Sequence, residues 1–200
     1  MNAPIILASG SAIRQQILQG AGLSFDIVRP DVDEVAIKEA CLHDGRSLED
    51  AALALAIAKA EAVQPLIDPA AYVIASDQIL EFEQRGFDKP VDMAEARARL
   101  KELSGQAHYL LNGTVVYQGG VKVYENLARS TLIMHTFNDT QIDQYLEEAG
   151  PDILASVGAY QVEGLGARLF KKIEGDYFAV LGLALFPLLT FLRDASAIDF

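Results

Sequence analysis

A short turn that carries hydroxyl groups joins the first apolar run of the chain to its first helical pattern. The apolar run 5–8 stops at Ser9, Gly10 and Ser11, and a helical pattern containing Arg14 follows at once. Amide groups at a helix N-terminus attract negative charge, and an arginine adds donors that suit phosphate or carboxylate oxygens. These residues therefore predict a site for an anion.

A second segment places an aspartate after a buried strand. The apolar residues 72–75 are followed by Ser76, Asp77 and Gln78. The carboxyl ends of strands in open α/β sheets are the places where ligands bind. A helix cap is the other common role for an aspartate here, but the residues after Gln78 read as extended chain. Asp77 is thus a candidate general base or metal ligand.

Three carboxylates gather at Asp31, Asp33 and Glu34, directly after Pro30. They repel one another unless they are solvated or bind a cation. The pattern of the aspartyl-phosphate phosphatases is rejected, because Pro30 separates the first aspartate from the strand and the typical continuation is missing. From the residues alone, a solvated loop is the favoured interpretation.

Two lysines and one glutamate stand in less specific settings. Lys89 precedes Pro90, which imposes extended backbone. Lys59 lies on an apolar, alanine-rich helical pattern, where snorkelling to solvent is the ordinary interpretation. Glu163 stands among glycines, which permit close approach to a flat ligand, although turns alone also explain them. The three histidines lack metal-ligand spacing, which argues against a zinc site.

The elements that must position these residues alternate between strands and helices before a β-meander, which predicts an α/β fold with a mixed sheet. Ser47 and Asp50 have the spacing of a capping box. The expected helices span residues 12–19, 47–63, 92–103 and 138–148, and the apolar segment 178–192 is expected to form a strand followed by a terminal helix. The expected strands span residues 5–8, 25–29, 72–75, a short hairpin in 79–87, a long hairpin with a Gly119–Gly120 turn in 109–137, and 167–173.

Composition limits the classes of partner. The chain has 200 residues, 51% of them hydrophobic, and a formal net charge of −12. Its length suits one domain, or one domain of two lobes, with ample core. The acidic balance argues against a nucleic acid polymer, because binding to a phosphate backbone needs a basic surface. A small anionic ligand remains compatible, since a few local cations can reverse the field inside one cleft.

Cysteine use and hydropathy indicate the compartment. Cys41 is the only cysteine, so the chain forms no internal disulfide and suits a reducing environment. The chain opens without a basic leader region. The most apolar segment, residues 178–192, is shorter than a bilayer span and contains Pro187. A cytoplasmic protein without membrane association is expected.

Together, in this order, these segments resemble the Maf family of nucleoside triphosphate pyrophosphatases. The resemblance runs from residue 5 to about residue 183. The matching stretches are LASGSAIR, PDVDE, AKAEAV, ASDQ, DKP, LSG, GAYQVEGLG and IEGDY. The resemblance implies a single domain over residues 1–200 with a two-lobed Maf/ITPase-like fold. That fold has an elongated mixed sheet flanked by helices, and a central cleft lies between the lobes. The family is often dimeric, so the resemblance also admits a homodimer.

The resemblance assigns roles to individual residues. The residues that it assigns to the substrate phosphates are Ser9, Arg14 and Lys59. The residues that it assigns to catalysis are Asp77, Glu34 and Lys89. Glu34 and Asp77 would hold Mg²⁺ or Mn²⁺, which are hard ions suited to carboxylate and phosphate oxygens. Asp77 would also activate the water that attacks the α-phosphorus of a nucleotide, releasing pyrophosphate and a nucleoside monophosphate.

The same resemblance favours a modified guanine nucleotide as the substrate. The residues assigned to base specificity are Ile13, Gln78 and Glu163. Gln78 after Ser-Asp, together with Glu163, is similar to the branch that hydrolyses 7-methyl-GTP. A carboxylate accepts hydrogen bonds from the two adjacent donors of guanine, and N7 methylation strengthens them. Ile13 departs from this branch, where an aromatic residue is common.

Two alternatives remain open. A dTTP/UTP-type pyrophosphatase of the same family is the first, and Glu163 and Gln78 count against it. The second is a nucleotide-binding regulator of septum formation that acts in cell division without turnover. The presence of Asp77, Glu34, Lys59 and Lys89 argues for catalysis, because a pure binding module has no use for an activating carboxylate.

Overall fold

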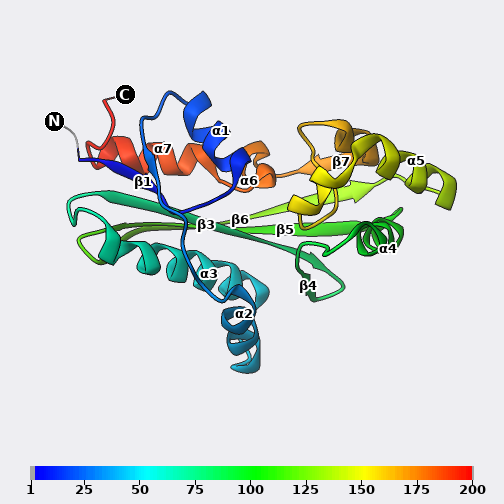
Figure 1. The fold of residues 1–200 in the computed structure, drawn as a ribbon, viewed down its shortest axis with the longest axis horizontal. Coiled ribbons are helices and arrows are strands. Elements are labelled where there is room, and N and C mark those ends of the chain that lie inside the picture. The colour runs from blue at the N-terminus through cyan, green and yellow to red at the C-terminus, as the bar shows by residue number, and fades with distance from the viewer. Residues whose placement is uncertain (1–2, 200) are drawn as a thin grey trace. The chain divides into compact units, whose positions relative to one another are not determined.

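The computed structural model describes residues 3–199 as an α/β protein with a mixed seven-stranded sheet flanked by helices (Figure 1). The expected fold class is confirmed. The strands are β1 (Ile5–Leu7), β2 (Asp26–Ile27), β3 (Tyr72–Phe82), β4 (Arg85–Phe87), β5 (Ala107–Gln118), β6 (Val121–Met134) and β7 (Phe170–Glu174). The helices are α1 (Ala12–Gly20), α2 (Glu34–His43), α3 (Leu48–Val63), α4 (Met93–Leu103), α5 (Asp139–Ala149), α6 (Tyr177–Leu181) and α7 (Leu185–Asp194). Short 3₁₀ turns lie at Gln64–Leu66, Pro151–Ala155 and Leu165–Leu169.

The strand order is β2-β1-β3-β5-β6-β7, and β4 pairs with β3 outside this path. Strand β1 is parallel to both β2 and β3, with Leu7 opposite Ile74. The pairs β3–β4 and β6–β7 are antiparallel. The sheet is therefore mixed, with its parallel part at β1.

The chain divides into two compact units. The first consists of Met1–Gln78, Asn112–Ala128 and Asp176–Phe200, and the second of Ile79–Leu111 and Arg129–Gly175. Each of β3, β5 and β6 contributes residues to both units. The arrangement of a single domain around a central cleft stays a prediction.

In the first unit, the alternation of side chains along β1 and β3 separates two apolar clusters. One face packs with α1 and α7, and its residues on the two strands are Ile5, Leu7, Tyr72 and Ile74. The other face packs with α3, and its residues on the two strands are Ile6, Ala8, Val73 and Ala75. Successive side chains of a strand point to opposite faces, so both faces of this part of the sheet are covered by helices. Figure 1 shows α3 on the face opposite to α1 and α7.

The many alanines of α3 follow from the closeness of that helix to the sheet. A Cβ atom added at Gly113 on β5 would lie 2.7 Å from the carbonyl oxygen of Ala52. Ala52, Ala56 and Ala60 are completely buried in this contact layer. A larger side chain on either side would push α3 away from the strands, and Lys59 with it.

In the second unit, α4 and α5 pack together, and Asp92 caps α4 by accepting from the backbone N–H of Glu95 at 2.8 Å. The loop that contains the glycine-rich segment 158–166 is tied to β5 at one buried contact. His108 Nε2 lies 2.7 Å from the hydroxyl of Tyr160. Both rings are buried, and burial lowers the pKa of His108 to about 4.

Several elements have the predicted boundaries. Ser47 and Asp50 form the expected capping box of α3, with Asp50 N–H donating to Ser47 Oγ at 3.1 Å. A cap of this kind stabilises a helix by about 1 kcal/mol. Asn138 caps α5 in the same manner through Gln141. The hairpin of β5 and β6 turns at Gly119 and Gly120, which both have the positive φ that favours glycine.

Three predictions about local structure were wrong or incomplete. Helix α2 begins at Glu34, where a solvated loop was favoured, because the side chain of Asp33 caps it by accepting from Ala36 N–H at 3.0 Å. Strand β3 does not end at residue 75 but continues to Phe82. Asp77 therefore lies within a strand, just past the end of its neighbour β1.

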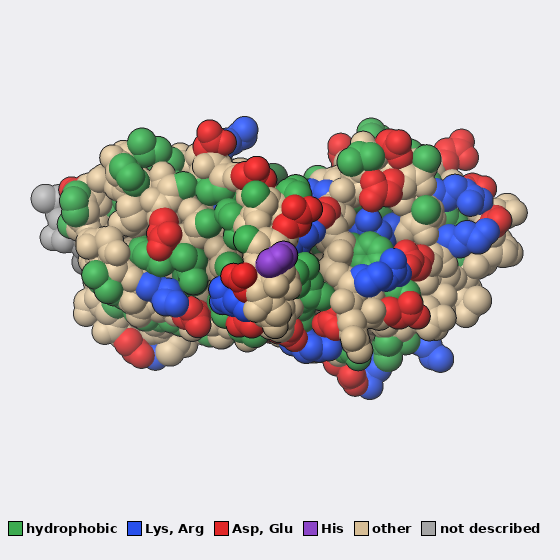
Figure 2. All heavy atoms as spheres, turned by 90° about the horizontal axis from the view of Figure 1, so that it is seen from below, with side chains coloured by type: hydrophobic (Ala, Val, Ile, Leu, Met, Phe, Trp, Pro, Cys, Tyr) green, Lys and Arg blue, Asp and Glu red, His purple; other side chains and the backbone are tan. Residues whose placement is uncertain are grey.

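The C-terminal apolar segment forms two helices, α6 and α7, where a strand followed by a helix was expected. Gly182, with φ of 111°, ends α6 in the left-handed conformation. Pro187 stands in the first turn of α7, where the missing N–H has no helical partner to lose. Within residues 3–199, no helix is both long and apolar enough to span a bilayer. Figure 2 shows acidic and basic side chains interspersed with apolar ones on one face of the molecule.

Candidate functional site

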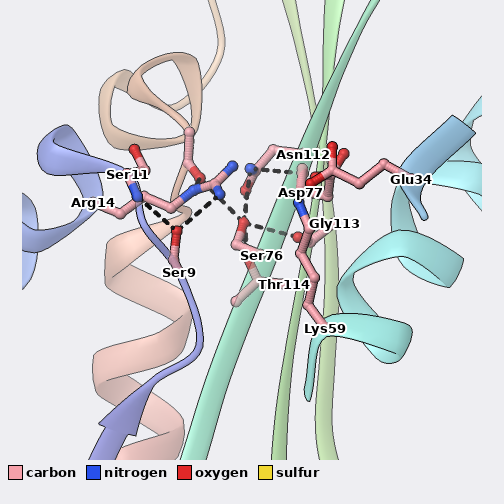
Figure 3. Close-up of polar contacts among 11 residues, drawn as sticks. Ser9, Ser11, Arg14, Glu34, Lys59, Ser76, Asp77, Asn112, Gly113 and Thr114 are labelled. Carbon is pink, nitrogen blue, oxygen red and sulfur yellow. Dashed lines mark hydrogen bonds and ion pairs between the residues drawn. The ribbon is translucent and has the colours of Figure 1, made fainter. Parts of the chain in front are cut away.

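The end of β1, the start of α1 and the middle of β3 bring the candidate residues of the first unit together. Strand β1 ends at Leu7, opposite Ile74, and the backbone N–H of Ala8 donates to the carbonyl oxygen of Ile74 at 2.8 Å. The chain then turns into α1, while β3 runs on through Ser76 and Asp77. Figure 3 shows Ser9 and Arg14 on one side of β3 and Lys59 and Glu34 on the other.

The anion site predicted at the start of α1 has a fixed geometry. Arg14 Nε donates to the carbonyl oxygen of Gly182 at 2.7 Å, and Arg14 Nη1 lies 3.4 Å from Ser9 Oγ. Ser9 Oγ also accepts from the backbone N–H of Ser11 at 3.2 Å. Ser11 makes no side-chain cap, so the first amides of α1 keep their capacity for another acceptor. The guanidinium and these amides thus form a donor set suited to phosphate oxygens.

The charge of Arg14 interacts with the acidic side chains of the site. Burial lowers the pKa of Arg14, and the nearby carboxylates of Asp77 and Glu34 act in the opposite direction. Arginine remains protonated under such perturbation, because its ordinary pKa lies far above neutral pH. The site therefore holds a permanent positive charge close to two carboxylates.

Lys59 joins the two candidate carboxylates. Its ammonium group lies 2.7 Å from Glu34 Oε1 and forms a buried ion pair with Asp77 Oδ1. The side chains of Lys59 and Asp77 are only 8% and 10% exposed, whereas that of Glu34 is 55% exposed. Snorkelling to solvent is thus the wrong interpretation for Lys59. Glu34 reaches this position because it is the first residue of α2.

The carboxylate pair fits a divalent cation that is shared with a phosphate ligand. Glu34 and Asp77 already converge on one cationic group, the ammonium of Lys59, and both present hard oxygen donors. In residues 3–199 there is no cluster of three or more His, Cys, Asp or Glu side chains that could hold a metal ion alone. Mg²⁺ is commonly held by one or two carboxylates, with phosphate oxygens and water completing its octahedron.

The two first-unit residues assigned to base specificity have structural contacts. Gln78 Nε2 donates to the carbonyl oxygens of Ala179 and Val180 at 2.9 and 3.1 Å, near the end of α6. Ile13 is partly buried against the apolar cluster of α1 and α7. Their roles in base recognition stay predictions.

Lys89 lies in the second unit, on an exposed segment that Arg99 anchors. Arg99 Nη1 donates to the carbonyl oxygen of Asp88 at 2.9 Å and to that of Val157 at 2.6 Å. Its guanidinium also stacks over the ring of Phe87 at 4.4 Å. Arg99 is 5% exposed and was missed from the sequence, because an arginine in a charged amphipathic helix is ordinarily a surface residue.

Glu163 is exposed on the glycine-rich loop of the second unit. Glycine is required at Gly166 in this loop, since a Cβ atom there would lie 2.5 Å from the carbonyl oxygen of Gln161. Burial and, second, the charge of Glu163 raise the pKa of Tyr145 to about 12. Glu163 thus lies on a loop that packs closely at Gly166, and its charge acts on Tyr145.

The structure also shows a buried polar network that sequence reasoning missed. Ser76, Asn112 and Thr114 are completely buried and hydrogen bonded to one another. Asn112 and Thr114 stand in an apolar strand pattern, where the alternation alone gives them no special meaning. The signal available in the sequence was the presence of these three polar residues next to apolar ones in two largely buried strands.

The α/β fold brings Arg14, Lys59 and the carboxylates of Asp77 and Glu34 together in the first unit. The model of the family described as "Maf-like protein" matches residues 4–195 of the chain. The chain belongs to this family.

Its relatives carry enzyme names. A protein of Maricaulis maris (strain MCS10) named nucleoside triphosphate pyrophosphatase is 46% identical over 194 residues, which cover 97% of each chain. A protein of Jannaschia sp. (strain CCS1) named nucleoside triphosphate pyrophosphatase 1 is 43% identical over 189 residues, 94% of this chain and 95% of that one. A protein of Rhizobium johnstonii named 7-methyl-GTP pyrophosphatase is 42% identical over 199 residues, covering both chains in full.

Proposed function

We propose that this protein is a nucleoside triphosphate pyrophosphatase, a hydrolase that acts on acid anhydrides and converts a nucleotide to its monophosphate and pyrophosphate. Relatives with this name cover nearly the whole chain at 43–46% identity. The observation that carries the proposal is the convergence of Arg14 and Lys59 with Asp77 and Glu34 in the first unit. Donors for a triphosphate and a carboxylate base are what hydrolysis of a phosphoanhydride requires.

The proposed chemistry is an in-line hydrolysis at the α-phosphorus. Asp77 accepts a proton from the attacking water while the new bond from the water oxygen to phosphorus forms. The bond from the α-phosphorus to the bridging oxygen breaks, and pyrophosphate leaves with that oxygen and its electron pair. Arg14 and the first amides of α1 stabilise negative charge on the phosphate oxygens, with Ser9 orienting the guanidinium.

Divalent metal dependence is part of the proposal. Glu34 and Asp77 are the residues that would hold Mg²⁺ or Mn²⁺, and the chemistry supplied by such an ion is neutralisation of charge on the triphosphate. Lys59 exchanges its carboxylate partners for phosphate oxygens when substrate enters. Lys89 supplies a further positive charge to the substrate phosphates.

For the substrate we propose 7-methyl-GTP or another modified guanine nucleotide. One full-length relative, 42% identical, carries the name of that activity. Glu163 supports this choice by chemistry, because a carboxylate accepts from the two adjacent donors of a guanine edge and repels the acceptors of thymine or uracil. Gln78 and Ile13 complete the proposed base contacts. A homodimer is also proposed and is tested by light scattering on the purified protein.

The deciding experiment is a panel of nucleotides with Mg²⁺ or Mn²⁺, read as released pyrophosphate. The proposal expects the highest kcat/KM with 7-methyl-GTP and loss of turnover with Asp77→Asn. Preference for dTTP or UTP would support the pyrimidine-type alternative and reject the proposed base. Tight nucleotide binding without turnover would support the septum-regulator alternative.

A further inference from the structure

The buried network behind Asp77 connects the two halves of the candidate site. Ser76 Oγ lies at its centre, with four polar partners at 2.9–3.2 Å. It donates to the carbonyl oxygen of either Gly113 or Gly182, and it accepts from Asn112 Nδ2 (Figure 3). Thr114 Oγ1 has one proton, which it donates to either Ser76 Oγ or Asn112 Oδ1.

Asn112 has four hydrogen-bonding partners. Its Nδ2 group donates to Ser76 Oγ at 3.0 Å and to the carbonyl oxygen of Asp77 at 3.2 Å. Its Oδ1 atom accepts from Thr114 Oγ1 and from the backbone N–H of Ala184, both at 3.2 Å. The backbone N–H can only donate, which fixes the orientation of the amide. Asn112 therefore connects the backbone of the proposed base to the loop between α6 and α7.

That loop also holds the arginine of the anion site. The carbonyl oxygen of Gly182 accepts from Arg14 Nε at 2.7 Å and from Ser76 Oγ at 3.1 Å. With Nε bound to Gly182, the Nη groups are the part of the guanidinium that is left for phosphate oxygens. A shift of the Gly182 carbonyl would turn the guanidinium away from Ser9 and the start of α1.

We propose that Ser76 and Asn112 are positioning residues: through Gly182 and the Asp77 backbone they hold Arg14 and Asp77 in the geometry that binds and hydrolyses a triphosphate. This inference rests on the proposed function for its substrate, but its first readout does not need turnover. The network is not confined to the core, because Ser76 and Arg14 share the carbonyl oxygen of Gly182 as an acceptor. A buried polar network favours one geometry, because a buried donor or acceptor left without a partner is costly.

The test compares Ser76→Ala with Val115→Ala, a completely buried residue of β5 whose side chain packs in the apolar cluster on the α3 face. The probe is inorganic tripolyphosphate, with its Kd measured by calorimetry on folded proteins of known Tm. We expect Ser76→Ala to weaken binding about fivefold, the effect of one lost hydrogen bond. Val115→Ala should lower the Tm and leave the Kd unchanged.

A double-mutant cycle with Arg14 separates positioning from general loosening. If Ser76 acts through Gly182 and Arg14, Ser76→Ala should have less than a twofold effect on Kd in an Arg14→Ala background. The same fivefold loss in both backgrounds overturns the inference, as does an unchanged Kd for Ser76→Ala or an equal loss for Val115→Ala.

Turnover gives the second readout and keeps the two proposals apart. With the best nucleotide of the panel, Ser76→Ala should raise KM about fivefold with kcat within twofold, whereas Asn112→Asp should also lower kcat, because it removes the donor to the Asp77 backbone. Wild-type protein that binds tripolyphosphate but releases no pyrophosphate contradicts the proposed function and leaves the positioning role intact. Wild-type protein that binds no tripolyphosphate overturns both.

Discussion

Replacing Lys59 with Met tests whether the two carboxylates of the site depend on a buried counter-ion. The substitution keeps a long flexible side chain and removes the ammonium group. Asp77, whose side chain is 10% exposed, then loses its ion-pair partner, while Glu34, at 55% exposure, can turn to water. The cost of the substitution therefore falls mainly on Asp77.

The size of the effect follows from this burial. Removing one partner of a buried ion pair costs about 3–5 kcal/mol, because the remaining charge is left unpaired. The positive charge of Arg14 still acts on Asp77, so we take the lower end, about 3 kcal/mol. In a protein of 200 residues this corresponds to a fall in Tm of roughly 6–12 °C.

The assay is thermal unfolding in the presence of EDTA, with Lys101→Met as the control. Lys101 pairs with Asp139 at 2.9 Å, but both side chains are more than half exposed, so the control should lose less than about 1 kcal/mol. The double variant Lys59→Met with Asp77→Asn should be more stable than Lys59→Met alone, since no unpaired carboxylate remains at Asp77. A Tm unchanged by Lys59→Met, or a double variant that is less stable still, would refute the reasoning.

Divalent cations extend this prediction. Without the ammonium group, Mn²⁺ no longer competes with Lys59 for Glu34 and Asp77, so Mn²⁺ should raise the Tm of Lys59→Met more than that of the wild-type protein. The gain grows with the logarithm of the Mn²⁺ concentration once the site is occupied. An equal shift in both proteins would mean that the metal binds elsewhere.

Four further outcomes are expected. Asp77→Asn should lower kcat for pyrophosphate release by about 10²–10⁴-fold, and a folded variant with nearly normal kcat would remove this group from the mechanism. Arg14→Ala should raise KM by a similar factor for every base, because phosphate is common to all substrates; a base-dependent factor would place this arginine at the base. Glu163→Gln should lower kcat/KM for 7-methyl-GTP by roughly 5–150-fold, equivalent to about 1–3 kcal/mol. Hydrolysis of UTP should be unchanged or faster. Equal effects on both substrates would reject the proposed specificity. Burial lowers the pKa of His108 from 6.5 in the unfolded chain to about 4 in the folded protein, so the unfolded chain binds the proton first and the free energy of unfolding falls as the pH drops from 6.5 to 4. His108→Gln should remove about 3 kcal/mol of this loss of stability, measured as the free energy of unfolding against pH. An unchanged pH profile would contradict the prediction.

The sequence by itself determined many of the local elements and the list of candidate site residues. Ser47 and Asp50 indicate the start of α3 because a capping box is a contact between residues three positions apart. The turn at Gly119 and Gly120 follows from the positive φ that glycine adopts without strain. The candidates Ser9, Arg14 and Asp77 follow from motifs in which chemistry and spacing are local.

Tertiary structure decided what those residues touch. Lys59 reads as a solvated side chain on an apolar helix, and it is buried because α3 approaches β5 so closely that Gly113 has no room for a Cβ atom. Asn112 and Ser76 are 36 residues apart, and each has little meaning until the sheet places them side by side. Hydrogen bonds and ion pairs act over about 3 Å in space. Which distant segments come within that range is decided by the packing of α3, β3, β5 and the α6–α7 loop, and that packing alone turned the candidates Lys59, Asp77 and Arg14 into one connected site.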